Sequence, residues 1–130
     1  MISWAKTSRD IESGRVLLAR ENLVAFSKRL NVRYVPVDHH WTIADALQAV
    51  ERGDERRVLL TVPPRHGKSE LGSINFPPWF LGRQPDKRII SASYAAALAN
   101  TFSRRARNLI GHPLYPFEIT TAGDLSNVQR

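Results

Sequence analysis

The stretch Val58-Leu-Leu-Thr-Val-Pro-Pro-Arg-His-Gly-Lys-Ser-Glu70 decides which fold the sequence predicts. Its first five residues are apolar or β-branched and lie between Arg57 and Pro63, a pattern that is typical of a short strand buried on both faces. A turn follows, and a helix is expected to begin at Gly67. A strand, a turn and a helix in this order form the setting in which phosphate-binding loops occur.

The residue types in the turn suit the binding of a phosphate. Gly67 has no Cβ and would let the backbone approach a phosphate oxygen closely. The N–H groups of the loop and of the helix start would direct positive charge at the anion. Lys68 would reach the β- and γ-phosphates, and the Ser69 hydroxyl would coordinate Mg²⁺. The complete pattern has a further glycine where this chain has Val62, so a basic turn that caps a helix is the alternative.

Apolar residues at helical spacing predict helices in the rest of the chain. Gly53 stands where a helix-ending glycine is expected. Pro77 and Pro78 are expected to kink or break the helix that begins after the loop. The predicted helices cover 8–30, 41–52, about 67–75 and 95–110.

The order of the predicted elements indicates an α/β fold. A second buried strand is predicted over 88–92, which gives two parallel strands joined by a right-handed crossover. Two strands make an incomplete parallel sheet, because sheets usually have about four to six. We therefore expect an N-terminal helical segment over 1–53, followed by the first part of an α/β domain over 54–130.

The composition of the chain limits its function. With 130 residues it is long enough for one small domain, and without cysteine it can form neither disulfides nor thiolate metal sites. Its four histidines show no spacing suited to zinc. Arginine supplies 15 of the 19 basic residues, and the net charge of +7 favours a polyanionic partner such as nucleic acid, or else a solvated basic surface. The longest uncharged run, 89–103, is too short and too polar to span a bilayer, so no membrane partner is expected.

The loop over 62–70 resembles the variant Walker A motif of tailed-phage terminase large subunits, in particular those that read Pro-Pro-Arg-His-Gly-Lys-Ser. The resemblance implies an ASCE-type P-loop NTPase domain, the motor that drives viral double-stranded DNA into a capsid in the cytoplasm of a bacterial host cell. It also implies ATP and Mg²⁺ as cofactors, and the small terminase subunit and the portal protein as partners. It covers roughly 15–130 and extends to His39-His40-Trp41, to Phe76-Pro-Pro-Trp-Phe-Leu-Gly-Arg83 and to Ile90-Ser-Ala-Ser-Tyr94.

The resemblance assigns roles to the residues of the loop. Arg65 would sense or stabilise the γ-phosphate, and Ser69 would hold Mg²⁺ through the bound ATP. Tyr94 would lie in the segment that couples the nucleotide state to DNA movement. The residues implied to bind the nucleotide are Pro64, Arg65, His66, Gly67, Lys68, Ser69 and Glu70.

The sequence lacks groups that hydrolysis of ATP needs. A Walker B carboxylate at the end of an apolar strand would hold Mg²⁺, but no acid after Ser69 follows a run of four apolar residues. The resemblance also implies a second, RNase H-like nuclease domain that cuts concatemeric DNA, and its carboxylate cluster is missing from this sequence. We therefore expect the N-terminal part of a large terminase, which binds nucleotide but does not hydrolyse it alone. The alternative is a non-catalytic basic phage or prophage protein that binds nucleic acid or a protein partner. The acids after Ser69 that were considered for the Walker B carboxylate are Glu70, Asp86, Glu118 and Asp124.

Two further groups of side chains each have two interpretations. Arg104, Arg105 and Arg107 would contact DNA phosphates or a neighbouring subunit, or would form a solvated helix face. A group of aromatic and histidine side chains ahead of the loop would pack against adenine, or between the N-terminal helices and the sheet. The members of this second group are Tyr34, His39, His40 and Trp41.

Overall fold

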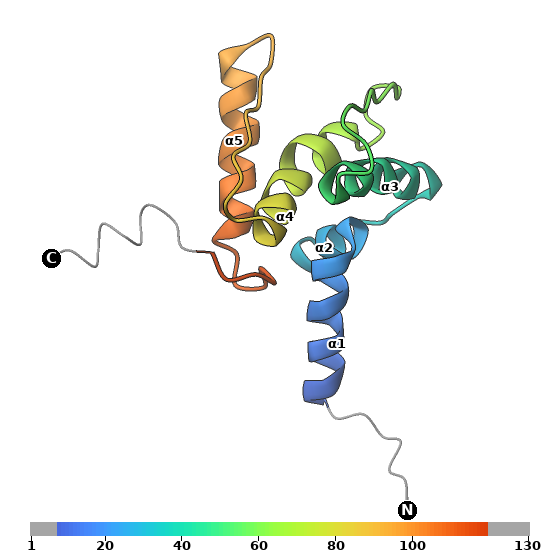
Figure 1. The fold of residues 1–130 in the computed structure, drawn as a ribbon, viewed down its shortest axis with the longest axis vertical. Helices are drawn as coiled ribbons and strands as arrows, with labels where there is room; N and C mark the ends of the chain where they lie inside the picture. The colour runs from blue at the N-terminus through green and yellow to red at the C-terminus, as the bar shows by residue number, and fades with distance from the viewer. Residues whose placement is uncertain (1–7, 120–130) are drawn as a thin grey trace, which may run out of the picture.

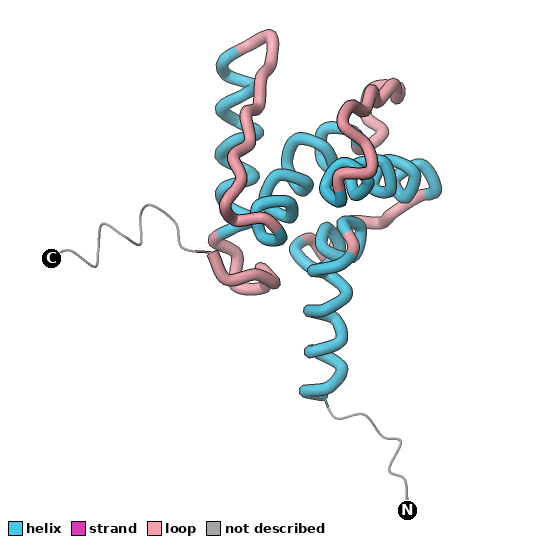
Figure 2. The backbone as a smooth tube through the Cα atoms, in the orientation of Figure 1, coloured by secondary structure: helices cyan, strands magenta, loops and turns pink. Residues whose placement is uncertain are grey.

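The computed structural model describes residues 8–119, and it is helical. In Figure 1, α1 points down and α5 rises from a centre that contains α2, α3 and α4. Figure 2 shows helices joined by loops, and no strand is found within residues 8–119. The helical elements are α1 (Ser8–Glu21), α2 (Leu23–Leu30), α3 (Asp38–Arg52), the π-helical turn η1 (Glu70–Asn75), α4 (Phe76–Arg83) and α5 (Ala96–Ile110).

The prediction of an α/β fold with a parallel-sheet P-loop NTPase core is therefore wrong for the described residues. The segments 58–62 and 88–92 form no backbone hydrogen bonds with other described segments. A strand exists only through hydrogen bonds to a neighbouring strand, and neither segment has such a neighbour in this part of the chain. Their apolar side chains are also only partly covered: Leu59 is 87% and Ile90 is 95% exposed, whereas Leu60 and Val62 pack against the edge of the core.

The apolar residues at helical spacing within 8–30, called the N-terminal stripe below, form two helices instead of the single helix predicted there. The break falls at Asn22, whose backbone is extended and whose Oδ1 accepts a hydrogen bond from the Ala25 N–H at 3.0 Å. Asparagine caps the start of a helix well because its side chain replaces a missing backbone acceptor. The stripe itself is confirmed, because Ala19, Leu23 and Phe26 are fully buried.

The core lies where α1 and α2 meet α3, η1 and α4. Trp79 of α4 is 1% exposed, and its indole N–H donates to the carbonyl of Ala19 at 3.2 Å. Phe26 and Leu71 are completely buried in the same cluster. Each large apolar side chain buried in this way contributes about 1.5–3 kcal/mol to stability. The helices before and after the loop thus share one core.

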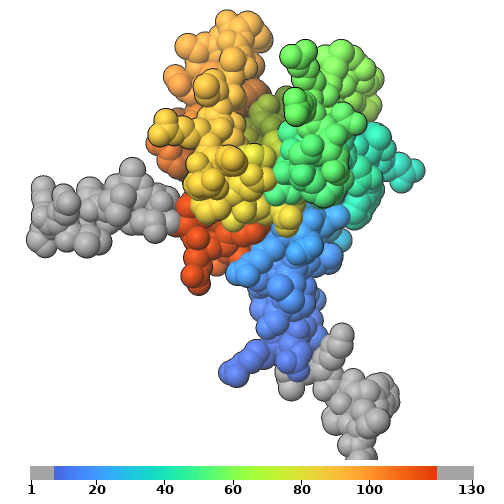
Figure 3. Space-filling view, viewed as in Figure 1, coloured from blue at the N-terminus to red at the C-terminus, as the bar shows by residue number. Residues whose placement is uncertain are grey.

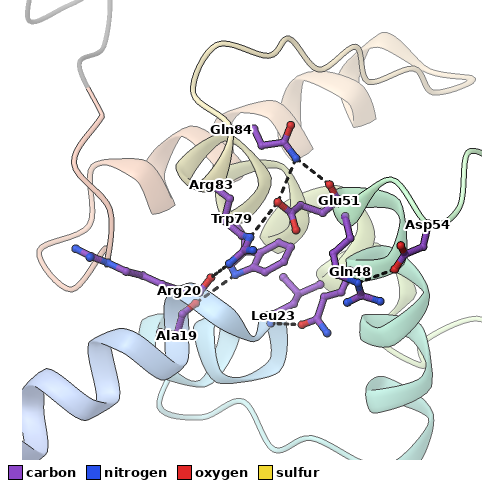
Figure 4. Close-up of polar contacts among 10 residues, drawn as sticks. Ala19, Arg20, Leu23, Gln48, Glu51, Asp54, Trp79, Arg83 and Gln84 are labelled. Carbon is purple, nitrogen blue, oxygen red and sulfur yellow. Dashed lines mark hydrogen bonds and ion pairs between the residues drawn. The ribbon is translucent and has the colours of Figure 1, made fainter.

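Polar side chains join the same helices at the edge of the core (Figure 4). Gln48 of α3 accepts a hydrogen bond at 2.7 Å from the Leu23 N–H, which has no acceptor inside its own helix. Glu51 forms an ion pair with Arg83 at 3.0 Å, and its carbonyl accepts from the Gln84 side chain at 2.8 Å. These contacts fix α3 against α2 and α4, and α3 is the helix that contacts the loop described below.

The prolines were predicted to kink or break the helix after the loop; no loop interrupts it there, but its regular geometry changes just before them. The backbone widens into a π-helical turn, η1, and the Phe76 N–H donates to the carbonyl of Leu71 five residues earlier. Pro77 and Pro78 then take the first positions of α4. These positions tolerate proline because their N–H groups have no acceptor inside the helix. η1 and α4 thus follow one another without a loop between them, and the change from π-helical to α-helical geometry falls at Phe76.

Candidate phosphate-binding loop

The loop between the extended segment 58–62 and η1 has two residues in the left-handed conformation. Arg65 has a φ of 64° and Gly67 a φ of 78°. Left-handed residues that alternate along a loop with residues of negative φ turn successive N–H groups toward one side, where an anion can bind. A left-handed conformation costs a residue with a Cβ about 1–2 kcal/mol, so contacts elsewhere must hold Arg65 in place. Figure 3 shows the loop region, in green, projecting at the top of this face, apart from the orange column around α5.

Lys68 and Ser69 lie at the start of the helix, as the sequence predicts, and both side chains are exposed. The helix begins with a hydrogen bond from the Leu71 N–H to the carbonyl of Gly67 at 3.0 Å. The Ser69 side chain does not cap this helix. Neither the Lys68 ammonium nor the Ser69 hydroxyl bonds to another residue of the described part. Both groups are therefore free to bind a ligand at the mouth of the loop.

Three histidines meet at the loop. The carbonyl of His66 is contacted by Nε2 of His39 at 2.9 Å and by Nε2 of His40 at 3.2 Å. A carbonyl only accepts hydrogen bonds, so both Nε2 atoms carry the donated proton. The His66 ring in turn lies 2.8 Å from the carbonyl of Pro64 through Nδ1. The loop is therefore bonded both to itself and to the first turn of α3.

The surroundings of His40 favour its neutral form. Burial lowers the pKa of His40 below its usual 6.5, and the nearby charge of His39 lowers it further. The Val37 N–H donates to Nδ1 of His40 over a long 3.4 Å, which leaves the ring proton on Nε2. Tyr34 stacks on the His40 ring with centroids 5.4 Å apart. Burial also raises the pKa of Tyr34 to about 12. The segment that holds these side chains therefore packs between the N-terminal helices and the loop.

Glu70 and the arginines of α5 differ in their contacts. Glu70 Oε2 forms an ion pair at 2.8 Å with Nη2 of Arg105, one of the predicted nucleic-acid contacts. Arg104 and Arg107 are exposed on α5, and no acidic partner for either is found within residues 8–119. The structure thus joins Arg105 to the helix start and leaves two arginines on the surface.

The described residues provide no separate metal site. No group of three or more His, Asp or Glu side chains within residues 8–119 is placed to hold a metal ion. An ion bound with ATP would need few protein ligands, because Mg²⁺ is usually held by one or two side chains and the phosphates. The free Ser69 hydroxyl fits that role. Asp124, one of the acids considered above, lies outside the described residues.

Other hollows of the molecule lie away from the loop. One of about 490 Å³ lies between α1 and α2, and one of about 220 Å³ lies beside α4 and α5. Neither is lined by a residue of 63–70. No helix in the described part is both long and apolar enough to cross a membrane. Residues 63–66, 68 and 69 of the loop are exposed at the surface.

Comparison of the chain with protein-family models, with curated proteins and with solved structures gives no match.

Proposed function

We propose that the chain binds the phosphates of ATP, together with Mg²⁺, at the loop 64–70, as the nucleotide-binding part of a terminase-type DNA-packaging motor. The observation that carries this proposal is the placing of Lys68 and Ser69. They follow the left-handed Gly67 directly, lie at a helix start, and have no partner within the described residues. A cation, a hydroxyl and a helix start together are well suited to a triphosphate and its metal ion.

Each group would do a different task. The Lys68 ammonium would bind the β- and γ-phosphate oxygens, and Ser69 would supply one ligand to the Mg²⁺ that ATP brings. The free N–H groups of the loop would donate hydrogen bonds to the remaining phosphate oxygens. Arg65 lies exposed at the tip and would reach the γ-phosphate. We expect binding without turnover, because the groups above bind the phosphates but do not activate a water molecule.

The partners of the proposed motor follow from the resemblance. Double-stranded viral DNA would contact the exposed Arg104 and Arg107 of α5, and the setting would be the cytoplasm of a bacterial host. The small terminase subunit and the portal protein would be the protein partners. Glu70 and Arg105, which pair at 2.8 Å, would connect the nucleotide loop to the DNA-contacting helix.

Lys68→Ala tests the proposed function. We expect Mg-ATP affinity, measured by isothermal titration calorimetry, to fall at least about tenfold, since a hydrogen bond to a charged group is lost. Lys87→Ala is the matched control, because it removes the same charge from an exposed position away from the loop. Equal affinities of Lys68→Ala and the parent chain would overturn the proposal. Polynucleotide binding with a steep salt dependence that Lys68→Ala leaves unchanged would support the alternative of a non-catalytic basic binding protein.

A further inference from the structure

We propose that His39 and His40 are positioning residues of the nucleotide site, which hold the loop in its phosphate-accepting shape without touching the phosphates themselves. Both belong to the first turn of α3, far from the loop in the sequence. The identity of the ligand as Mg-ATP rests on the proposed function. The positioning of the loop by the two histidines can be tested without any ligand.

The two histidines fix the orientation of one peptide group. Their Nε2 atoms lie 2.9 and 3.2 Å from the His66 carbonyl oxygen, so both of its lone pairs are engaged. The peptide between His66 and Gly67 is trans, and in a trans peptide the carbonyl and the following N–H point in opposite directions. Because α3 holds the carbonyl, the Gly67 N–H must point away from α3. It has no backbone acceptor in the described part of the chain, so it is available to an anion.

The histidines are themselves held in place by their neighbours. The His40 ring is 9% exposed and lies between Tyr34, which stacks on it, and His39, whose ring meets it edge-on at 4.4 Å. A Cβ on Gly67 would lie 2.5 Å from Nε2 of His40, so the ring and the loop are in close contact. The first turn of α3 therefore determines how far and in which direction the loop can move.

The inference requires an N–H donor at both His39 and His40. Variants that keep or remove this donor therefore distinguish a role in hydrogen bonding from a role in packing alone. His39→Ala removes a donor from a half-buried position outside the core. His39→Gln and His40→Gln remove the ring but keep an N–H group at a similar distance from the helix. His112→Ala is the matched control, since His112 is the histidine outside this cluster. A structural role without hydrogen bonding would not be rescued by glutamine.

The first experiment is limited trypsin digestion of the full chain, with the cleavage sites identified by mass spectrometry. Trypsin cuts after Arg65 and Lys68, and both are exposed. We expect cleavage there to be about fivefold faster in His39→Ala, the factor expected for the loss of one hydrogen bond. His39→Gln and His112→Ala should match the parent chain, and cleavage after Lys87 should stay constant in all variants. Unchanged loop cleavage in His39→Ala, or equal acceleration after Lys87, would overturn the inference.

The second experiment measures Mg-ATP affinity in the same variants. We expect His39→Ala to weaken binding about fivefold and His39→Gln and His40→Gln to restore it to within about twofold. Parent-like affinity in His39→Ala, in a chain whose binding is lost in Lys68→Ala, would overturn the inference and leave the proposed function intact. Absence of Mg-ATP binding in the parent chain would overturn the proposed function, and trypsin cleavage would then decide the positioning role alone.

Discussion

Two constraints act on Gly67: the backbone conformation of the loop and the packing of α3 against it. Its φ of 78° lies in the left-handed region, which other residues enter only at a cost. Its missing side chain also makes room for the His40 ring, because a Cβ there would lie 2.5 Å from Nε2. These two demands are independent, since the first concerns the backbone and the second concerns a neighbour. A glycine is needed here even in the absence of a ligand.

Gly67→Ala should lower the free energy of unfolding by about 1–2 kcal/mol for the backbone conformation alone, with a further loss from the contact with His40. Gly72→Ala is the matched control, because a Cβ at Gly72 meets nothing within 4 Å and needs no left-handed backbone. It should leave stability unchanged or raise it slightly. Urea denaturation measures both changes. In a His40→Ala background the cost of Gly67→Ala should shrink toward the backbone value, and an unchanged cost would show that the contact with His40 is unimportant.

At the scale of elements, local sequence signals predicted the helices better than the sheet. The helix expected over 95–110 is found as α5, and the one expected over 41–52 is found as α3 with Gly53 left-handed at its end. The segment 58–62 was predicted as a strand from its apolar, β-branched residues. Such residues favour an extended backbone, but a sheet also needs a partner strand, which no local pattern specifies.

In the candidate site, too, features set by neighbouring residues could be predicted from the sequence, whereas contacts between distant residues could not. The position of Lys68 and Ser69 at a helix start could be predicted, because glycine, the turn and the helix are neighbours in the sequence. The contact of His39 and His40 with the His66 carbonyl spans 27 and 26 residues, and it depends on how α3 packs. The adjacent histidines were a visible signal, but the sequence left open whether they pack against adenine or between elements.

Asn22 decides that the N-terminal stripe forms two helices. Asn22→Ala should lower the free energy of unfolding by about 1 kcal/mol, because the Ala25 N–H loses its acceptor. Asn22→Asp keeps a side-chain oxygen and places a negative charge at a helix start, so it should retain the parent stability. Thermal unfolding followed by circular dichroism compares the three proteins. If Asn22→Ala were as stable as the parent, the cap would not be what ends α1 at this point.

At the scale of the whole molecule, stability depends on one core that the helices share. The core around Trp79 joins the helices on both sides of the loop. Leu60 and Val62 of the extended segment 58–62 pack against the edge of this core, whereas Leu59 and Ile90 are exposed. The shape of the loop thus depends on the stability of the whole core, because α3 holds the loop and is itself held by Gln48 and Glu51. A change that weakens the contact of α3 with the loop should therefore be visible in global unfolding.

The stability of the chain should depend on pH because His40 is buried where α3 contacts the loop. The pKa of His40 is lowered below 6.5 in the folded chain, mainly by burial, so below pH 6.5 the unfolded chain binds more protons. The stabilisation is fully present above that pH and is lost as the pH falls toward the folded pKa. The titratable groups that face His40 are His39 on its own helix, His66 in the loop and Tyr34 in the preceding segment.

We expect the melting temperature to fall between pH 7 and pH 5 in the parent chain and to fall less in His40→Gln, whose side chain does not titrate there. His112→Ala should retain the full fall, because His112 lies outside the cluster. Differential scanning calorimetry at pH intervals measures the three profiles. Parallel profiles for the parent and His40→Gln would mean that protonation of His40 does not oppose folding. The fall in stability would then come from other groups, and burial of the neutral His40 ring beside the loop would contribute nothing to it. The hydrogen bond from Nε2 of His40 to the His66 carbonyl would still form, because a protonated imidazole also donates from Nε2.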